Sequence, residues 1–315
     1  MLGLRENTPS SGKRKPGTAP GSKYGKTLTL EERADVPSML FFTVLNRVRQ
    51  TGICQLSYSG GTVFKCPQLR QLIALATSVI VDGGGGLPTI APIPSNAPLN
   101  LNEQVVEALD ICSNAGPCPV QSLILCNAPL RLSHASLLAS ILQRSRRSSN
   151  LALVSVVLAN VHLPLTAVVS LACALAQSPS CLQQLVLERC QVGSAGAASL
   201  FEALVYNRTL WKLDLSGNNV GDSACPAISR ALLTDTCALR VLALSRNFLS
   251  DRGVLGYLAP SMTSSHLEVL VLRQNPRVSA LGIAALRQAT AAPASLYAPS
   301  SSDQLGVRVV VDSDL

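Results

Sequence analysis

The chain has 315 residues and a formal net charge of +8, with 47% hydrophobic, 14% charged and 3% aromatic residues. This balance excludes a mostly disordered chain, because enough apolar side chains are present to fill a sizeable core. The mean hydropathy of +0.31 exceeds what a compact globule needs, so the aliphatic residues belong either to a membrane segment or to a repetitive core.

Residues 1–26 are expected to form a disordered basic tail. Six basic residues against Glu6 give this segment a net charge of +5, and its Pro, Gly and Ser content cannot repay the entropy of folding. We expect salt-sensitive contacts with an acidic surface such as a tubulin tail. Nucleic acid is not the expected partner, because Tyr24 is the one aromatic residue available for base stacking. The residues expected to make the contact are Lys13, Arg14, Lys15, Lys23 and Lys26.

Residues 27–49 are predicted to form an N-terminal helical cap. Asp35 and Pro37 are start signals for a helix over 37–49. Its apolar face is expected to contain Met39, Leu40, Phe42, Val44, Leu45 and Val48.

Residues 50–119 are predicted to contain degenerate repeats with a Gly/Pro-rich loop. One weak unit starts near Ile53, and another lies at 95–101, where SNAPLNL echoes CNAPLRL at 126–132. The four glycines at 83–86 suggest a phosphate-binding loop, but no Gly-Lys-Ser/Thr follows and four prolines precede residue 99. A flexible loop is therefore the preferred interpretation.

Residues 120–290 carry a regular repeat of 28 to 33 residues. Apolar residues recur at the first, fourth and sixth positions of each unit, and Asn or Cys commonly occupies the ninth. The units start at Val120, Leu153, Leu182, Leu210, Leu239 and Leu267. Helices are predicted at 193–206, 222–233, 251–262 and 279–289, and residues 291–315 are predicted to be a loop with a capping strand over 305–311.

The LxxLxLxxN/CxL pattern resembles the ribonuclease-inhibitor-like subfamily of leucine-rich repeats. The resemblance implies an α/β solenoid with a curved parallel sheet inside and helices outside. It also implies that Asn218, Asn247 and Asn275 tie neighbouring backbone turns, with Cys190 as the alternative residue. Ala128 and Val161 depart from the pattern, so looser turns are expected there.

The uncharged run over 151–176 is long enough to cross a bilayer. Its centre nevertheless contains Asn160, His162 and Pro164, and its aliphatic residues keep the phase of the repeat. A buried strand and helix are therefore predicted, with no transmembrane segment.

The ten cysteines include no CxxC pair, and the three histidines are not clustered. Neither a metal site nor another cofactor is expected. Because no signal segment is apparent at the N-terminus, we expect a reducing, cytoplasmic location, in which the thiols are small buried residues without disulfides.

Alternation along each strand predicts which side chains face the concave surface. The middle column is predicted to contain Ile124, Val157, Val186, Asp214, Ala243 and Val271. The polar rim is predicted to contain Gln184, Glu188, Arg189, Lys212, Arg246 and Arg273, together with Asp214 of the middle column, and Trp211 is a candidate anchor. The apolar stripe indicates either a partner site or ordinary strand propensity.

Catalysis is not expected, because no GxSxG motif is present and the carboxylates are scattered. His134 and His162 are interpreted as surface or capping residues in the turns. The sequence favours a protein-binding scaffold, in a cytoskeletal or axonemal setting. The alternative is a GTPase-activating regulator of a small GTPase, implied by the activity of some proteins with similar repeats.

A cluster of Arg144, Arg146 and Arg147 lies in the longest turn of the regular repeats. Two interpretations stay open, a solvated insertion loop and a basophilic kinase site at Ser149 whose phosphate would offset the arginines.

Overall fold

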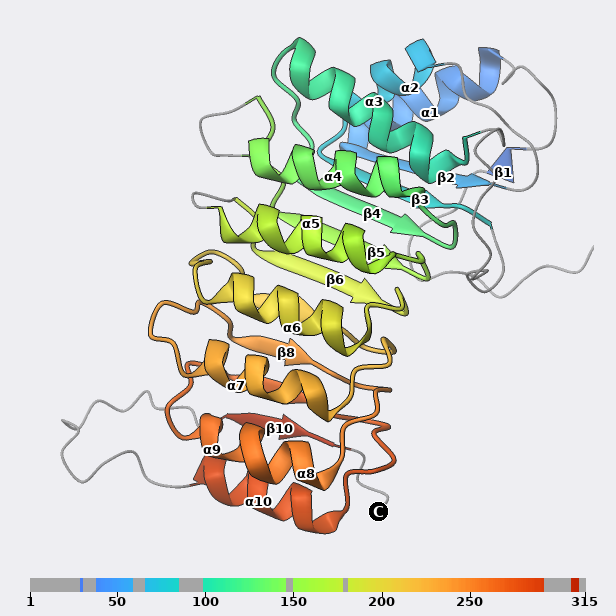
Figure 1. Ribbon diagram of the computed structural model, residues 1–315. Coiled ribbons are helices and arrows are strands. Elements are labelled where there is room, and N and C mark those ends of the chain that lie inside the picture. The colour runs from blue at the N-terminus through green and yellow to red at the C-terminus, as the bar shows by residue number, and fades with distance from the viewer. Residues whose placement is uncertain are drawn as a thin grey trace, which may run out of the picture.

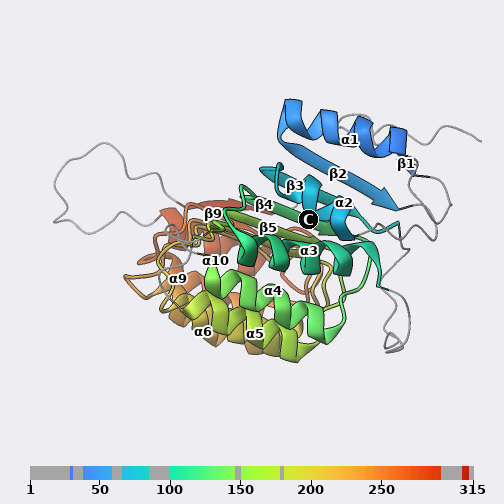
Figure 2. The same ribbon diagram turned by 90° about the horizontal axis from the view of Figure 1, so that it is seen from above.

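The computed structural model describes residues 29–30, 38–58, 66–84, 99–145, 150–177, 181–291 and 307–311. They form one ten-stranded parallel sheet whose strand order follows the chain. Helices α3 to α10 stack in one layer in front of this sheet (Figure 1), and the view along the stack shows the strands beside that layer (Figure 2). The predicted α/β solenoid is confirmed.

The elements alternate between strand and helix along the chain. The strands are β1 (Thr29–Leu30), β2 (Ile53–Tyr58), β3 (Ser78–Asp82), β4 (Ser122–Cys126), β5 (Ser155–Ala159), β6 (Gln184–Glu188), β7 (Lys212–Asp214), β8 (Val241–Ala243), β9 (Val269–Val271) and β10 (Arg308–Val310). The helices are α1 (Ser38–Thr51), α2 (Cys66–Ile73), α3 (Leu101–Ala115), α4 (Leu132–Arg144), α5 (Leu165–Ala176), α6 (Gly193–Leu204), η1 (Asp222–Ala224), α7 (Cys225–Leu232), α8 (Asp251–Gly253), η2 (Val254–Leu258), α9 (Ala259–Met262) and α10 (Ala280–Ala291).

The core is a layer of aliphatic side chains between the sheet and the helices. Residues that pair across successive strands form a fully buried column, comprising Val79, Leu123, Val156, Leu185, Leu213, Leu242 and Leu270. No single repeat can cover this column, so each strand and helix pair depends on its neighbours. The predicted solenoid thus accounts for the aliphatic excess and the low aromatic content.

The regular part of the stack follows the sequence closely. The helices predicted at 193–206, 222–233, 251–262 and 279–289 are present within two residues, although the third contains the π-helical stretch η2. The predicted last strand is present as β10. In α1, Phe42 is 58% exposed and Phe41 is buried instead, so the predicted face was wrong by one residue at that point.

The structure gives the register of the degenerate repeats, which the sequence leaves open. Cys54 of β2 pairs with Val79 of β3 and is buried, whereas Ile53 is 42% exposed. The unit assigned to 95–101 has its strand at β3 instead, and Leu101 begins helix α3. The predicted Gly/Pro loop mostly lies at 85–98, outside the described residues, as does the tail at 1–26.

The uncharged run over 151–176 forms β5 and α5, as predicted. Val156, Leu158, Leu171 and Leu175 are buried in the common core. Among the described residues, no helix combines the length and apolar character that crossing a bilayer requires.

Buried asparagines tie neighbouring turns together, as the resemblance implied. Asn247 Oδ1 accepts the N–H groups of Asn218 and Val220 at 3.0 Å, and its Nδ2 donates to the carbonyl of Leu215 at 2.9 Å. Asn218 and Asn275 make equivalent bonds in the adjacent turns. Cys190 donates its thiol to the Leu158 carbonyl at 3.2 Å.

Ala128 and Val161 lack a side chain that could make such a tie, and other amides join these turns. Asn160 Nδ2 donates to Asn127 Oδ1, and Asn127 Nδ2 donates to Asp82 Oδ1, both at 2.9 Å. Asn102 Nδ2 also donates to the Ala128 carbonyl at 2.9 Å.

Aspartates at the starts of the last helices bind the serine that precedes the next helix. Asp222 accepts the N–H of Ser250, and Asp251 accepts the N–H of Ser279, both at 2.8 Å. The serine hydroxyls donate to the second oxygens of the same carboxylates. A Cβ at Gly253 would overlap Asp222 Oδ1, so this contact requires glycine.

This arrangement predicts a pH-dependent contribution from Asp251. Its pKa is lowered because the carboxylate accepts hydrogen bonds from the Ser279 hydroxyl and N–H. A lowered pKa in the folded state means that the stabilisation is present above the unfolded pKa, about pH 4, and is lost as the pH falls through the folded pKa. We expect Asp251→Asn to lower the melting temperature at pH 7, and the difference from the wild type to narrow as the pH falls below about 4.

The matched control is Asp235→Asn, which changes an exposed carboxylate in the turn after α7. Thermal unfolding followed by circular dichroism between pH 2 and pH 7 measures the difference. A constant gap between Asp251→Asn and the wild type at every pH would contradict the prediction.

Most described cysteines are small core residues, as predicted. Cys54, Cys118, Cys181, Cys190, Cys225 and Cys237 are buried. Burial raises the pKa of Cys54, Cys190 and Cys225 to about 12, so these thiols stay protonated at neutral pH. Cys173 is exposed, and for this residue the prediction was wrong.

Candidate functional site: the concave face

The surface of the sheet opposite the helices, here called the concave face, consists of columns of paired residues. The middle column runs through Ile80, Ile124, Val157, Val186, Asp214, Ala243, Val271 and Val310. All of these side chains are partly exposed. Ile80 and Val310 extend the column predicted from the sequence at both ends.

The concave face changes character along the stack. From β3 to β6 the middle column is aliphatic, and the residues at the strand starts are Ser78, Ser122, Ser155 and Gln184. From β6 onward, charged side chains appear at Glu188, Lys212, Asp214, Arg246 and Arg273. An apolar strip therefore leads into a charged region on one continuous surface.

A hollow of about 330 Å³ lies within the charged region, at the ends of β6 to β9. Four residues of the predicted site line it, Glu188, Asp214, Arg246 and Arg273, together with Ser216, Ser245 and Gln274. The structure thus brings together four rim residues that lie up to 85 positions apart in the chain.

The remaining rim residues lie outside the lining of the hollow. Gln184 and Lys212 pair at the strand starts. Trp211 precedes β7 and is partly buried. Arg189 Nε lies 3.8 Å from Glu188 Oε1, and its side chain passes over Gly217, where a Cβ would lie 2.8 Å from Arg189 Cγ.

A residue with a left-handed backbone follows each of strands β4 to β9, directly after β4 to β6 and three positions after β7 to β9. Positive φ angles occur at Asn127, Asn160, Arg189, Gly217, Arg246 and Gln274, between 53° and 72°. In each repeat this conformation directs the backbone from the strand into the asparagine turn. It also places Arg246 and Gln274 side by side, and Arg246 Nε donates to Gln274 Oε1 at 2.5 Å.

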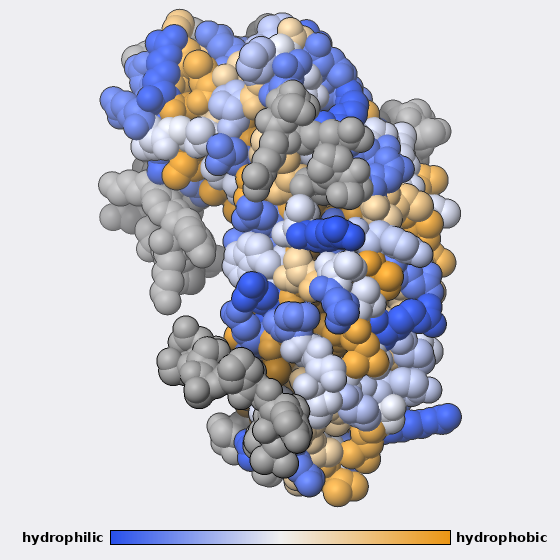
Figure 3. Space-filling model, turned by 90° about the vertical axis from the view of Figure 1, so that its left-hand side faces the viewer, coloured by the Kyte–Doolittle hydropathy of each residue, from blue (hydrophilic) through white to orange (hydrophobic). Residues whose placement is uncertain are grey.

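The edge of the solenoid where the strands begin is less suited to binding a protein partner than the concave face is. Apolar side chains exposed near the ends of helices include Leu75, Tyr206 and Leu233. Figure 3 shows this edge as small apolar patches separated by polar side chains. Large apolar contacts of one partner are therefore not favoured here.

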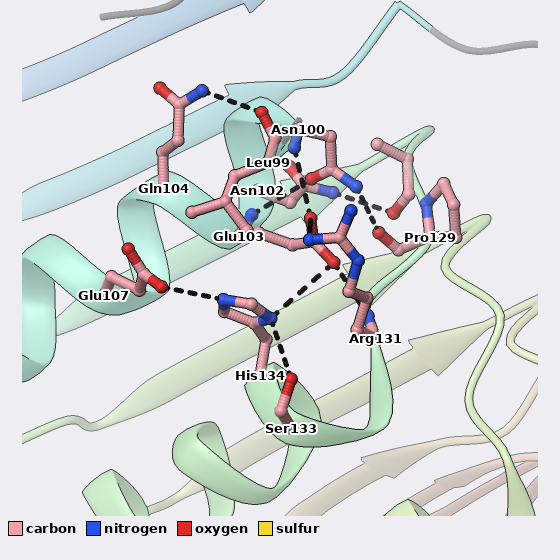
Figure 4. Close-up of polar contacts among 11 residues, drawn as sticks. Leu99, Asn100, Asn102, Glu103, Gln104, Glu107, Pro129, Arg131, Ser133 and His134 are labelled. Carbon is pink, nitrogen blue, oxygen red and sulfur yellow. Dashed lines mark hydrogen bonds and ion pairs between the residues drawn. The ribbon is translucent and has the colours of Figure 1, made fainter. Parts of the chain in front are cut away.

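A buried polar cluster, missed by sequence reasoning, joins α3 to α4 (Figure 4). Glu103 is fully buried and accepts the N–H groups of Asn100 at 3.1 Å and Arg131 at 3.0 Å. The Arg131 guanidinium lies 3.5 Å from the same carboxylate. Asn100 and Glu103 form a capping box, whose N-x-x-E spacing is a signal in the sequence.

The interpretation of His134 as a surface residue was wrong. It is 6% exposed on α4, with Nε2 3.1 Å from Glu107 Oε1 and Nδ1 3.3 Å from Ser133 Oγ. This order of groups resembles a catalytic triad, but Nδ1 also lies 3.7 Å from buried Glu103, and the cluster lies away from the concave hollow. We assign it a structural role, because it links α3 to α4. His162 is partly buried in its turn.

Several predicted features cannot be placed on the structure. Lys13, Arg14, Lys15, Lys23, Lys26 and Ser149 lie outside the described residues, as do Arg146 and Arg147. Arg144 is described and forms an ion pair with Asp110 across helices α3 and α4. Within the described ranges, no group of three His, Cys, Asp or Glu side chains is placed to hold a metal ion.

Comparison with known proteins places the repeat in context. A family model described as "Leucine Rich repeat" matches residues 206–229. The Homo sapiens protein "NACHT, LRR and PYD domains-containing protein 5" is 38% identical over 110 residues, which is 35% of this chain and 9% of that protein. The Bos taurus protein of the same name is 28% identical over 241 residues, or 70% of this chain and 21% of that protein.

A solved structure shares the fold. In the crystal structure of the Rad7 and Elc1 complex in yeast, one chain matches with a TM-score of 0.50 and 17% identity, over 76% of this chain and 55% of that one. The matched regions of the NACHT-containing relatives amount to about a fifth of their length or less. The repeat model and these relatives support a leucine-rich repeat family for this chain, whose fold is that of a leucine-rich repeat solenoid.

Proposed function

We propose that the chain is a non-catalytic scaffold that binds a protein partner on its concave face. One observation supports this most directly: the partly exposed aliphatic strip from Ile80 to Val186 continues into the charged hollow at the ends of β6 to β9. Protein interfaces combine an apolar centre with a polar rim in this way. The 28- to 29-residue unit supports the ribonuclease-inhibitor-like subtype.

Two parts of the proposal rest on the sequence alone. These are a cytoplasmic, cytoskeleton-associated setting and an electrostatic contact between the basic tail and tubulin or another acidic surface. Neither is needed for binding on the concave face, so each can fail without affecting it.

The test introduces charge into the middle column of the face, at one position in the apolar strip and one beside the hollow. Val186→Glu combined with Val271→Glu is expected to abolish capture of the partner, because two carboxylates would be desolvated in the contact. Partners are first identified by proximity labelling in cells and then measured by pull-down with purified full-length chain.

The control is Val169→Glu, which places one carboxylate on α5, where Val169 is 38% exposed on the helix side. Circular dichroism spectra and melting temperatures establish that all variants are folded. A partner bound equally by the wild type and the concave variant would refute the proposal, as would a partner lost only with Val169→Glu.

A further inference from the structure

We propose that the hollow at the ends of β6 to β9 binds an extended segment of the partner that carries one acidic and one basic side chain four residues apart. This inference rests on the proposed function and specifies the chemistry of its partner. It follows from the separation of charges within the hollow, the groups already satisfied there and the spacing of the strands.

The charges lie at opposite ends of a small-residue floor. Glu188 ends β6, and Ser216, Ser245 and Arg273 occupy the equivalent positions two residues beyond β7, β8 and β9. The backbones of Glu188 and Arg273 are therefore about 14 Å apart at a strand spacing of about 4.8 Å. Asp214 adds a second carboxylate near Glu188, and Arg246 adds a second guanidinium near Arg273. The two serines between them leave room for a ligand backbone.

These charges do not neutralise one another across the hollow. Among the described residues, no ion pair joins Glu188 or Asp214 to Arg246 or Arg273. Within the described part of the chain, the ion-pair partner of Glu188 is Arg189 at 3.8 Å, and both side chains are nearly half exposed. Asp214 Oδ1 accepts the Ser216 N–H at 2.9 Å, which leaves its second oxygen for a ligand.

The end of the hollow that contains Arg246 and Arg273 is arranged to bind a carboxylate. The bond from Arg246 Nε to Gln274 orients the guanidinium and leaves its two terminal nitrogens for another acceptor. Arginine binds carboxylates through two parallel N–H groups, which gives geometric specificity as well as attraction. Arg273 is exposed beside it.

The carboxylate belongs to a side chain and not to a chain terminus. Capture of a terminal carboxylate uses free backbone N–H groups. Here the N–H groups of Arg189, Gly217 and Arg246 already donate to the carbonyls of the next repeat, at 2.8 to 2.9 Å. With these three N–H groups occupied, the guanidinium groups of Arg246 and Arg273 are the charged donors at this end of the hollow.

A polyanion is a poor fit for the same hollow. A phosphate group or a nucleic acid backbone at the arginines would place further negative charge toward Glu188 and Asp214, which repel it. An extended segment rises about 3.4 Å per residue and alternates its sides, so residues four apart share a face and are about 13.6 Å apart. That distance matches the two ends of the hollow.

The experiment measures binding of defined peptides to the full chain by fluorescence anisotropy. The probes are labelled nine-residue peptides on a Gly/Ser/Thr background. They have Asp and Lys four positions apart in either order, Asp and Lys adjacent, two Asp, two Lys, or no charge. We expect one of the four-spaced peptides to bind at least tenfold more tightly than every other composition, with affinity falling between 50 and 300 mM salt.

Variants of the hollow then assign the contacts. Arg246→Ala with Arg273→Ala, and Glu188→Gln with Asp214→Asn, are each expected to weaken the four-spaced peptide at least tenfold. Arg252→Ala with Arg287→Ala removes two exposed arginines on the helix side and is expected to change nothing. Tightest binding of the two-Asp peptide, equal binding of all peptides, or no binding at 1 mM would overturn the inference.

The two proposals fail in different ways. If the peptides do not discriminate while Val186→Glu with Val271→Glu abolishes partner capture, the inference is wrong and the scaffold function stands. If the four-spaced peptide binds as expected but partner capture survives that double substitution, the proposed function is wrong.

Discussion

Replacing Glu103 by alanine is expected to lower the free energy of unfolding by about 3–5 kcal/mol, the cost of removing one partner from a buried ion pair. The carboxylate is fully buried, and it accepts N–H groups from both Asn100 and Arg131. Its loss would strand those two donors and remove the counter-charge of the Arg131 guanidinium, whose side chain is only 15% exposed.

Urea denaturation of the full chain measures this effect, with Glu107→Ala as the control. Glu107 lies one turn later on α3, with a 42% exposed side chain that contacts His134, and its removal is expected to cost about 1 kcal/mol or less. Hydrogen exchange should show the loss of protection concentrated in α3 and α4, because a solenoid repeat contacts only its neighbours. Equal urea midpoints for the two variants would contradict the prediction.

Replacing Asn247 by alanine is expected to cost about 2–4 kcal/mol, because buried polar groups left without partners cost about 1–3 kcal/mol each. Asn247 is 1% exposed. Its side chain accepts the N–H groups of Asn218 and Val220 and donates to the carbonyl of Leu215. Alanine can replace none of these bonds.

The control is Asn219→Gly, which removes an exposed amide while glycine tolerates the φ of 57° at that position. It is expected to change stability by about 0.5 kcal/mol or less. Because Asn247 binds the N–H of Asn218, Asn218→Ala and Asn247→Ala should be non-additive in a double-mutant cycle. Unfolding free energies that add within error, or a midpoint for Asn247→Ala equal to that of Asn219→Gly, would show that the ties are dispensable.

The fold of residues 120–290 could be predicted because one pattern determines both sheet and core. Leu185, Leu213, Leu242 and Leu270 recur at almost constant spacing and pair directly across the strands. Strand β3 has the same pattern at Val79 and Val81, but the insertion before α3 separates Val79 from Leu123 by 44 residues. The period is lost there, so the strand could not be recognised from repeat spacing.

The candidate site was predictable in its columns but not in its shape. Alternation within strands predicted that Glu188, Asp214, Arg246 and Arg273 lie on one rim, and the hollow includes all four. The hollow itself depends on two small residues, Ser216 and Ser245, which no pattern in the sequence identified as part of a site. The contacts of His134 were missed because its partner Glu107 comes from the preceding repeat, 27 residues away.

The hollow on the concave face is built from four consecutive strands and their turns, and every described residue that lines it lies between positions 188 and 274. Catalytic sites commonly gather side chains from loops scattered through a whole domain, so they cannot be moved as one piece. Here a single uninterrupted stretch of sequence contains all the described residues that line the hollow. If the hollow binds as proposed, its specificity could be exchanged between solenoids of matching repeat length by transferring that one stretch.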